Sequence, residues 1–212
     1  MAARAEQKLR TRRALLEAAL RQLSAERGFS SLSLREVARE AGIAPTSFYR
    51  HFPDLESLGM ALVDEAGEKL RRLMREARKR VDGDVGVVRA SVEAFMVFLG
   101  ENATLFYLLS RERAVGSEAM RAAIRREIGL FIDDLAVDLE SESRARAVPM
   151  KDVPLVAEAM VTIAFNEGMD ALDCPPEGRR ATAERMIRQL RMIALGAEAL
   201  AQRELQPRQT IP

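Results

Sequence analysis

The chain has 212 residues, of which 48% are hydrophobic, and its formal net charge is only +1. This apolar content is ample for a packed core, so the chain need not be disordered. The single cysteine, Cys174, excludes an intrachain disulfide framework and agrees with a reducing cytosol. No apolar run approaches the roughly 18 residues of a membrane span, and the basic N-terminus lacks the apolar stretch of a signal peptide, so we expect a cytoplasmic protein without membrane contact.

The charge is unevenly distributed along the chain. Residues 1–52 hold ten Lys/Arg and five Asp/Glu, whereas the remaining residues hold 23 and 27. A basic segment joined to a mildly acidic one is typical of a small nucleic-acid-binding module attached to a larger body. A chance asymmetry of solvated faces is the alternative at this point.

A first helix is predicted from about Gln7 to Arg27. Leucines recur through it at helical spacing, and Gly28 then ends the pattern. Cations at a helix N-terminus oppose the macrodipole, so they indicate either a position near phosphates or a frayed, solvated tail. Five such residues crowd this start: Arg4, Lys8, Arg10, Arg12 and Arg13.

A second, short helix is predicted to begin after Ser33. The spacing of Ser33 and Glu36 predicts a capping box, in which each side chain bonds the other residue's backbone amide. Gly42 follows the apolar stripe directly, where helices often end in a left-handed residue, and Ile43 is expected to fill the turn. The stripe is made by Leu34, Val37, Ala38 and Ala41.

A third helix, Thr46–Phe52, is predicted to be a recognition helix. Pro45 suits its first turn, and Phe48 and Phe52 face inward together because they lie four residues apart. The other face offers hydroxyl, phenol, guanidinium and imidazole groups, which bond phosphates and base edges. An ordinary solvated helix pair is the alternative, but the turn, the cap and these donors together favour DNA binding. The candidate DNA-binding residues are Arg35, Thr46, Ser47, Tyr49, Arg50 and His51.

Helical patterns continue to the end of the chain and no strand pattern occurs, so we predict an all-α fold of nine helices. The turn Asp82–Gly86 ends the long fourth helix, and residues 141–152 are the most loop-like stretch. The later helices are predicted at about 55–80, 87–99, 104–113, 117–140, 154–172 and 177–204. We place a DNA-binding domain at 1–53, a helical ligand-binding and dimerisation domain at 54–205, and a tail at 206–212.

Enzyme chemistry is poorly supplied. The only histidine, His51, lies in the predicted recognition helix, and no cluster of His, Cys and Asp has metal-ligand spacing. Cys174, beside two prolines, is more often inert than redox-active. A helical enzyme acting on lipids would need a nucleophile and a base that the sequence does not pair, so we expect no enzyme, no metal and no cofactor.

The helix-turn-helix residues resemble a known family. GIAPTSFYRHF, preceded by LSLREVAREA and a basic amphipathic helix, resembles the DNA-binding domain of the TetR family of repressors. RAEQK, LRRLMREARKR, EAMVTIAF and QLRMIALGA resemble the FabR and DesT branch of that family, which extends the similarity to roughly Leu200. The resemblance implies a TetR-like fold, with a three-helix DNA-binding domain followed by a six-helix ligand-binding and dimerisation domain.

One motif of the wider family is missing. Many members carry a lysine two residues after the Asn or Asp that follows the recognition helix, where it meets a phosphate. This chain has Asp54 at the first position and Glu56 at the second. The phosphate contact must therefore come from elsewhere, such as Arg35, Arg50 or the amides at the start of the fourth helix.

The branch implies a repressor of unsaturated fatty-acid biosynthesis genes that senses long-chain acyl-CoA or acyl-ACP in a tunnel through the helical body. Met and Phe suit such a deformable cavity, although plain core packing explains them more simply. Arg111 and Arg113 would meet a pantetheine phosphate or a thioester carbonyl, or else pair with Glu112 or Glu118. The candidate ligand-binding residues are Phe95, Phe98, Leu99, Phe106, Tyr107, Arg111, Phe131 and Ile163.

The family also implies a homodimer through the last two helices, which reads a palindromic double-stranded operator. We predict the interface stripe from alternating steps of three and four residues in the last helix. Its members are Met186, Leu190, Ile193, Ala197 and Leu200. A TetR-type repressor that senses another apolar molecule, such as a drug, is the alternative function.

Overall fold

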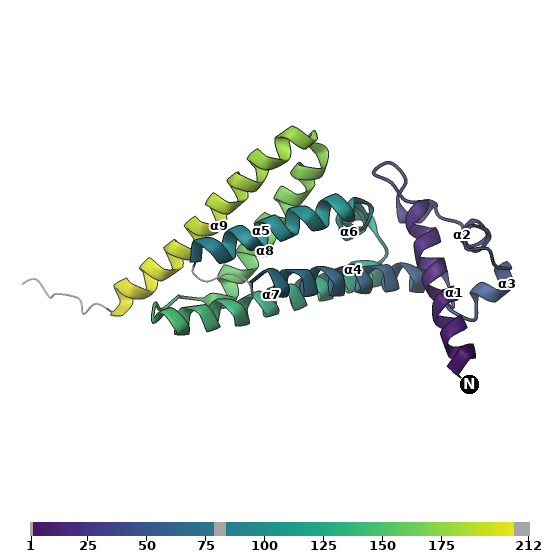
Figure 1. Ribbon diagram of the computed structural model, residues 1–212, viewed down its shortest axis with the longest axis horizontal. Helices are drawn as coiled ribbons and strands as arrows, with labels where there is room; N and C mark the ends of the chain where they lie inside the picture. Colours follow the sequence, from purple (N-terminus) through teal and green to yellow (C-terminus); the bar gives the residue numbers. More distant parts are fainter. Residues whose placement is uncertain (1, 79–83, 206–212) are drawn as a thin grey trace, which may run out of the picture. The chain divides into compact units, whose positions relative to one another are not determined.

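The computed structural model describes residues 2–78 and 84–205, and over these residues the fold is all-α, as predicted (Figure 1). Figure 1 labels the helices in chain order. They are α1 (Ala2–Arg21), α2 (Leu34–Glu40), α3 (Pro45–Phe48), α4 (Leu55–Arg78), α5 (Asp84–Glu101), α6 (Ala103–Val115), α7 (Glu118–Arg146), α8 (Val153–Asp173) and α9 (Pro176–Leu205), with the 3-10 helix η1 (Phe29–Ser31) between α1 and α2.

Two predictions fall partly or wholly outside the described residues. The tail 206–212 lies outside them altogether. The turn predicted at Asp82–Gly86 lies partly outside, and its last three residues already belong to α5.

The chain divides into two compact units. The first contains Met1–Lys69 and Asn102–Glu127, and the second contains Leu70–Glu101 and Ile128–Pro212. Both α4 and α7 therefore contribute residues to each unit. This division by contacts does not coincide with the domain boundary proposed after residue 53, which stays a prediction.

The N-terminal helices, residues 2–52, belong to the first unit, and we call them the head. Their apolar side chains contribute to the core of that unit. Burying each large apolar side chain stabilises such a core by about 1.5–3 kcal/mol. Phe48, Leu58 and Leu62 are fully buried in it, together with Leu15 of α1. The hydrophobic face of α1 is thus covered by α2, α3 and the first turns of α4.

The helices α6 and α7 also contact the head within this unit. Gly59 of α4 allows a close approach, because a Cβ there would lie 2.6 Å from the Phe29 ring and would also clash with Met120 of α7. Arg111 of α6 donates to the Glu26 carbonyl at 3.3 Å, and its guanidinium lies where a side chain on Gly28 would be. The start of α7 is fixed to α4 as well, by hydrogen bonds and ion pairs such as Arg126–Asp64.

In the second unit, α8 and α9 lie side by side and α5 packs against both (Figure 1). The guanidinium of Arg185 on α9 binds both carboxylate oxygens of Glu167 on α8, at 2.6–3.0 Å. Arg89 of α5 binds Glu184 of α9 in the same bidentate way, at 2.8 and 3.2 Å. Such planar charge-assisted pairs fix the register of neighbouring helices.

The predicted end of the first helix is wrong. The helix stops at Arg21 rather than Arg27. Ser24 ends it, because its hydroxyl accepts hydrogen bonds from the amides of Glu26 and Arg27 at 3.2 and 3.0 Å. Short hydroxyl side chains compete with helical hydrogen bonds in this way.

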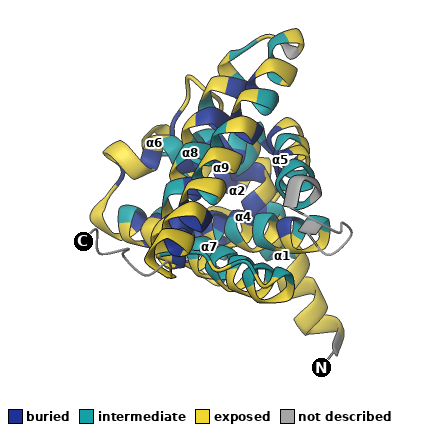
Figure 2. Ribbon diagram, turned by 90° about the vertical axis from the view of Figure 1, so that its left-hand side faces the viewer, coloured by how far each residue is buried: buried dark blue, intermediate teal, exposed yellow. Residues whose placement is uncertain are grey.

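The predicted interface stripe is also wrong at three positions. Met186, Leu190 and Ala197 of α9 are buried within their own chain, where they face the core of the second unit. Figure 2 shows that α9 has both buried and exposed faces. Its exposed large apolar residues are Met192, Leu195, Leu200 and Leu205.

Within the described residues, no single helix is long and apolar enough to cross a membrane. The consecutive segments Val87–Glu101 and Ala103–Val115 meet that criterion only when they are counted together.

Candidate nucleic-acid interface

The turn after α2 is built around Gly42, as predicted. Gly42 has a φ of +71°, in the left-handed region. Its amide donates to the Arg39 carbonyl at 3.1 Å, and the amide of Ile43 donates to the Ala38 carbonyl at 3.0 Å. This pair of bonds is the Schellman motif, which ends α2 sharply and sets the direction of the following segment.

The start of α2 differs from the prediction. Ser33 is the N-cap residue, with an extended backbone, but its side chain makes no capping hydrogen bond. The Glu36 carboxylate instead accepts a hydrogen bond from the Arg27 guanidinium at 3.0 Å. The capping box is therefore wrong, because a distant cation attracts the carboxylate that the local pattern assigned to Ser33.

The recognition helix is shorter than predicted. The helix α3 covers only Pro45–Phe48, with Pro45 in its first turn as expected. The chain continues as a turn, in which the amides of His51 and Phe52 both donate to the Phe48 carbonyl, at 2.8 and 3.0 Å. We refer to residues 45–52 as the recognition segment.

Two phenylalanines attach this segment to the head. Phe48 and Phe52 are 0% and 2% exposed, and their ring centroids lie 5.8 Å apart. The Arg12 guanidinium lies over the Phe52 ring, 4.2 Å from its centroid. Arg12 also donates to the His51 carbonyl at 3.4 Å, so α1 contacts the recognition segment at its C-terminal end.

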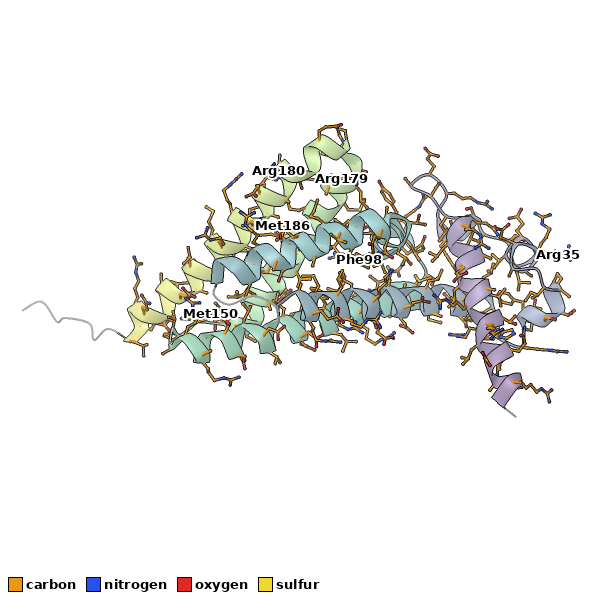
Figure 3. The ribbon with its side chains drawn as sticks, viewed as in Figure 1. Arg35, Phe98, Met150, Arg179, Arg180 and Met186 are labelled. Atoms are coloured by element: carbon orange, nitrogen blue, oxygen red, sulfur yellow. The ribbon has the colours of Figure 1, made fainter. Side chains whose placement is uncertain are left out.

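The predicted DNA-binding residues lie on the outer side of this segment and of α2. Tyr49 is 62% exposed, although its ring touches the edge of Phe48. Thr46 and Arg50 are exposed, whereas Ser47 and His51 are half-buried. Arg35, labelled in Figure 3, is exposed on α2, on the side away from α1.

The electrostatic environment of His51 is strongly positive. Burial lowers the pKa of its imidazole, and the charges of Lys8, Arg12 and Arg50 lower it further. Sequence analysis placed Lys8 and Arg12 only in a basic cluster, near phosphates or in a frayed tail. Because Lys8 and Arg12 are four residues apart, they lie on one face of α1. This spacing is the feature of the sequence that could have placed both beside the recognition segment.

Asp54 has a structural role after the recognition segment. Its carboxylate accepts a hydrogen bond from the Ser57 amide at 2.7 Å, which caps α4 and lowers the pKa of the Asp54 carboxyl group. The Ser57 amide is therefore already engaged within the chain, and the source of the phosphate contact that the missing lysine would make stays a prediction.

The predicted ligand-binding residues divide between the two units. The second unit holds Phe95, Phe98 and Leu99, which are buried, and Phe131 and Ile163, which are half-buried. Figure 3 labels Phe98 on α5.

The other three belong to the first unit. Phe106 is buried, Tyr107 is half-buried and Arg111 is exposed. The Arg111 guanidinium donates to the Glu26 carbonyl and lies where a side chain on Gly28 would be, so Arg111 has a structural role, and its ligand-binding role stays a prediction.

Comparison with known proteins gives two matching families. Residues 15–61 match the bacterial regulatory proteins of the tetR family. Residues 85–196 match the tetracyclin repressor-like C-terminal domain. The two matched segments contain the recognition segment and the greater part of the helices that follow it.

Solved structures give the same fold. A putative TetR-family regulator from Rhodococcus sp. has 21% identity and a TM-score of 0.70, covering 87% of this chain and 98% of its own. GusR from Salmonella enterica has 22% identity and a TM-score of 0.72, covering 87% and 95%. The fatty acid degradation regulator FadR from Bacillus halodurans has 16% identity and a TM-score of 0.71, covering 84% and 94%.

Gly42→Ala is expected to destabilise the protein by about 1–2 kcal/mol, the usual cost of the left-handed conformation for a residue with a Cβ. Nothing lies within 4 Å of a Cβ at this position, so backbone strain alone is responsible. Gly129→Ala in α7 is the matched control, since its Cβ also meets nothing within 4 Å and helix propensity should stabilise it by about 0.5–1 kcal/mol. Urea unfolding followed by circular dichroism measures both, and changes of the same sign would contradict the assigned turn.

Proposed function

Because the chain belongs to the TetR family of bacterial regulatory proteins, we propose that it is a dimeric repressor whose two heads read a palindromic operator. Members of this family are DNA-binding transcriptional regulators and not enzymes. One observation carries the proposal: the recognition segment buries Phe48 and Phe52 while it exposes hydrogen-bond donors on its other side. The excess of cations in residues 1–52 supports the same conclusion.

The exposed residues suit different contacts with DNA. Thr46 and Ser47 would approach bases or phosphates at the start of α3, and the Arg50 guanidinium would read a guanine or bind a phosphate. Tyr49, His51 and Arg35 would bind phosphates. Phosphate contacts set the position of the head, whereas base contacts provide the specificity.

We propose an apolar effector for the helical body, with long-chain acyl-CoA or acyl-ACP as the first class to test and unsaturated fatty-acid synthesis genes as the target. The support is the resemblance of separate stretches of the chain to FabR and DesT. The name of one structural relative, a fatty acid degradation regulator, points in the same direction. Another apolar small molecule is the second candidate.

We propose that α8 and α9 form the dimer interface, with residues that the sequence pattern did not select. Met192 and Leu195 of α9 are 69% and 54% exposed, and Leu155 of α8 is 62% exposed. Ala199 lies one turn beyond Leu195, on the same side of α9. Exposed apolar residues that gather on one helix pair indicate an interaction surface.

Arg50→Ala is expected to weaken operator binding by about 1–3 kcal/mol if Arg50 makes a bidentate contact with a guanine. Arg144→Ala, which removes an exposed arginine at the end of α7, is the matched control and should leave the affinity unchanged. Gel-shift titration at fixed salt measures both, and equal affinities for Arg50→Ala and the wild type would remove Arg50 from the interface.

Promoter DNA of the organism's own unsaturated fatty-acid synthesis genes is expected to bind tightly, and saturated and unsaturated acyl-CoA should shift the affinity in opposite directions. Fluorescence anisotropy at several salt concentrations measures this, because phosphate contacts make the affinity salt-dependent. DNA binding that acyl-CoA does not change would agree with the proposed repressor, reject acyl-CoA as its effector and favour another apolar molecule.

Leu195→Arg is expected to convert the dimer into a monomer, since it would place a charge in the centre of the apolar interface. Val137→Arg on α7 is the matched control, because Val137 is similarly exposed, at 63%, and lies outside the proposed interface. Light scattering coupled to size-exclusion chromatography gives the mass of each variant. A dimeric Leu195→Arg would argue against this interface.

A further inference from the structure

The only histidine of the chain, His51, lies close enough to three cations for their charges to lower its pKa. His51 follows α3, and Arg12 of α1 donates to its carbonyl while packing over the next ring, Phe52. Lys8 lies one helical turn before Arg12, and Arg50 directly precedes His51. The Nδ1 atom of His51 is buried and has no hydrogen-bond partner among the described residues.

Five cations of α1 and the recognition segment fall into two sets. Arg10 and Arg13 are neutralised on the helix itself, by Glu6 at 2.6 Å and Glu17 at 3.1 Å. The charged groups that act on His51 belong to the other set.

This other set is Lys8, Arg12 and Arg50, none of which forms an ion pair with any residue in the described ranges. The nearest acid along the chain, Asp54, is not among the charges that shift the pKa of His51. The neighbourhood of His51 therefore has an unbalanced positive charge, which an anion would neutralise.

We propose that Lys8, Arg12, Arg50 and His51 form one site for a phosphodiester group of duplex DNA, and that occupying this site is coupled to the uptake of one proton by His51. This inference rests on the proposed DNA-binding function. It adds Lys8 and Arg12 of α1 to the DNA contacts, and it adds the uptake of a proton. Without DNA, burial and the three cations disfavour the protonated imidazole. A bound phosphate opposes those cations, so the protonated imidazole becomes favourable.

The coupling has a defined sign. If DNA raises the affinity of His51 for a proton, then protonation raises the affinity for DNA by the same factor. Binding should therefore tighten as the pH falls through the interval between the free and bound pKa values, about tenfold for each unit that separates them. The proton comes from the solvent, and no covalent bond changes.

The direct test is an NMR titration of the untagged full-length protein. Because His51 is the only histidine, its imidazole gives a single unambiguous set of ring signals. The free protein should titrate below the ordinary value of 6.5. Saturation with a random-sequence duplex at low salt should raise that value, since phosphate contacts do not require an operator sequence.

Three variants separate the members of the site from ordinary charge effects. His51→Gln, which cannot take up the proton, should remove the pH dependence of duplex affinity. Lys8→Gln should raise the pKa of free His51 and reduce the further rise on binding. Arg10 lies two residues after Lys8 and is paired with Glu6, so Arg10→Gln should change neither the pKa of free His51 nor its rise on binding. Circular dichroism checks the folding of each variant, and the wild-type titration needs no variant at all.

The outcomes distinguish this inference from the proposed function. A wild type that binds no duplex at low salt would overturn both. Binding with an unchanged His51 pKa, or with the same pH dependence in His51→Gln, would overturn the proton-coupled site and leave the DNA-binding function in place. If inorganic phosphate at equal ionic strength raised the pKa as much as the duplex does, the site would bind free anions and the assignment to DNA would be wrong.

Discussion

The position of the recognition segment depends on the burial of Phe48 and Phe52. A helix of four residues has no stability of its own, because nucleation is unfavourable and too few hydrogen bonds follow it. Two buried phenylalanines contribute about 1.5–3 kcal/mol each. They therefore hold the segment, and the direction of every exposed donor on it follows from them. The cation–π contact of Arg12 with Phe52 contributes about 0.5–2 kcal/mol more and joins α1 to the same anchor.

This anchor accounts for one of the cations at the start of α1, Arg12. Cations oppose the helix dipole there, and Glu6 and Glu17 reduce that cost locally for Arg10 and Arg13. Arg12 has no acidic partner among the described residues, and the Phe52 ring and the His51 carbonyl contact its guanidinium instead. A structural residue thereby brings positive charge to the side of the recognition segment, where the proposed phosphate contact needs it.

The sequence predicted the structure correctly where a local conformation admits almost only one residue type. It predicted wrongly where a side chain had a second hydrogen-bond partner far away in the chain. Gly42 could be assigned to the left-handed turn because almost no other residue adopts it, and Phe48 with Phe52 share a face by spacing alone. The capping box failed because Glu36 had a second partner in Arg27, nine residues earlier in the chain. No local pattern reports such a competition. The same holds for Arg111, whose contact with Glu26 joins residues 85 positions apart.

The two apolar faces of α9 illustrate the same limit on a larger scale. Leu190 and Leu195 are five residues apart, which places them about 140° apart around a helix, so they cannot belong to one interface. A periodic pattern identifies both faces but does not say which one its own chain covers. That choice is made by α5 and α8, which pack on the side of the buried Met186 and Leu190. The residues left exposed by this packing are then the ones available to a second subunit, and an interface can be assigned to them only after the core of the single chain is known.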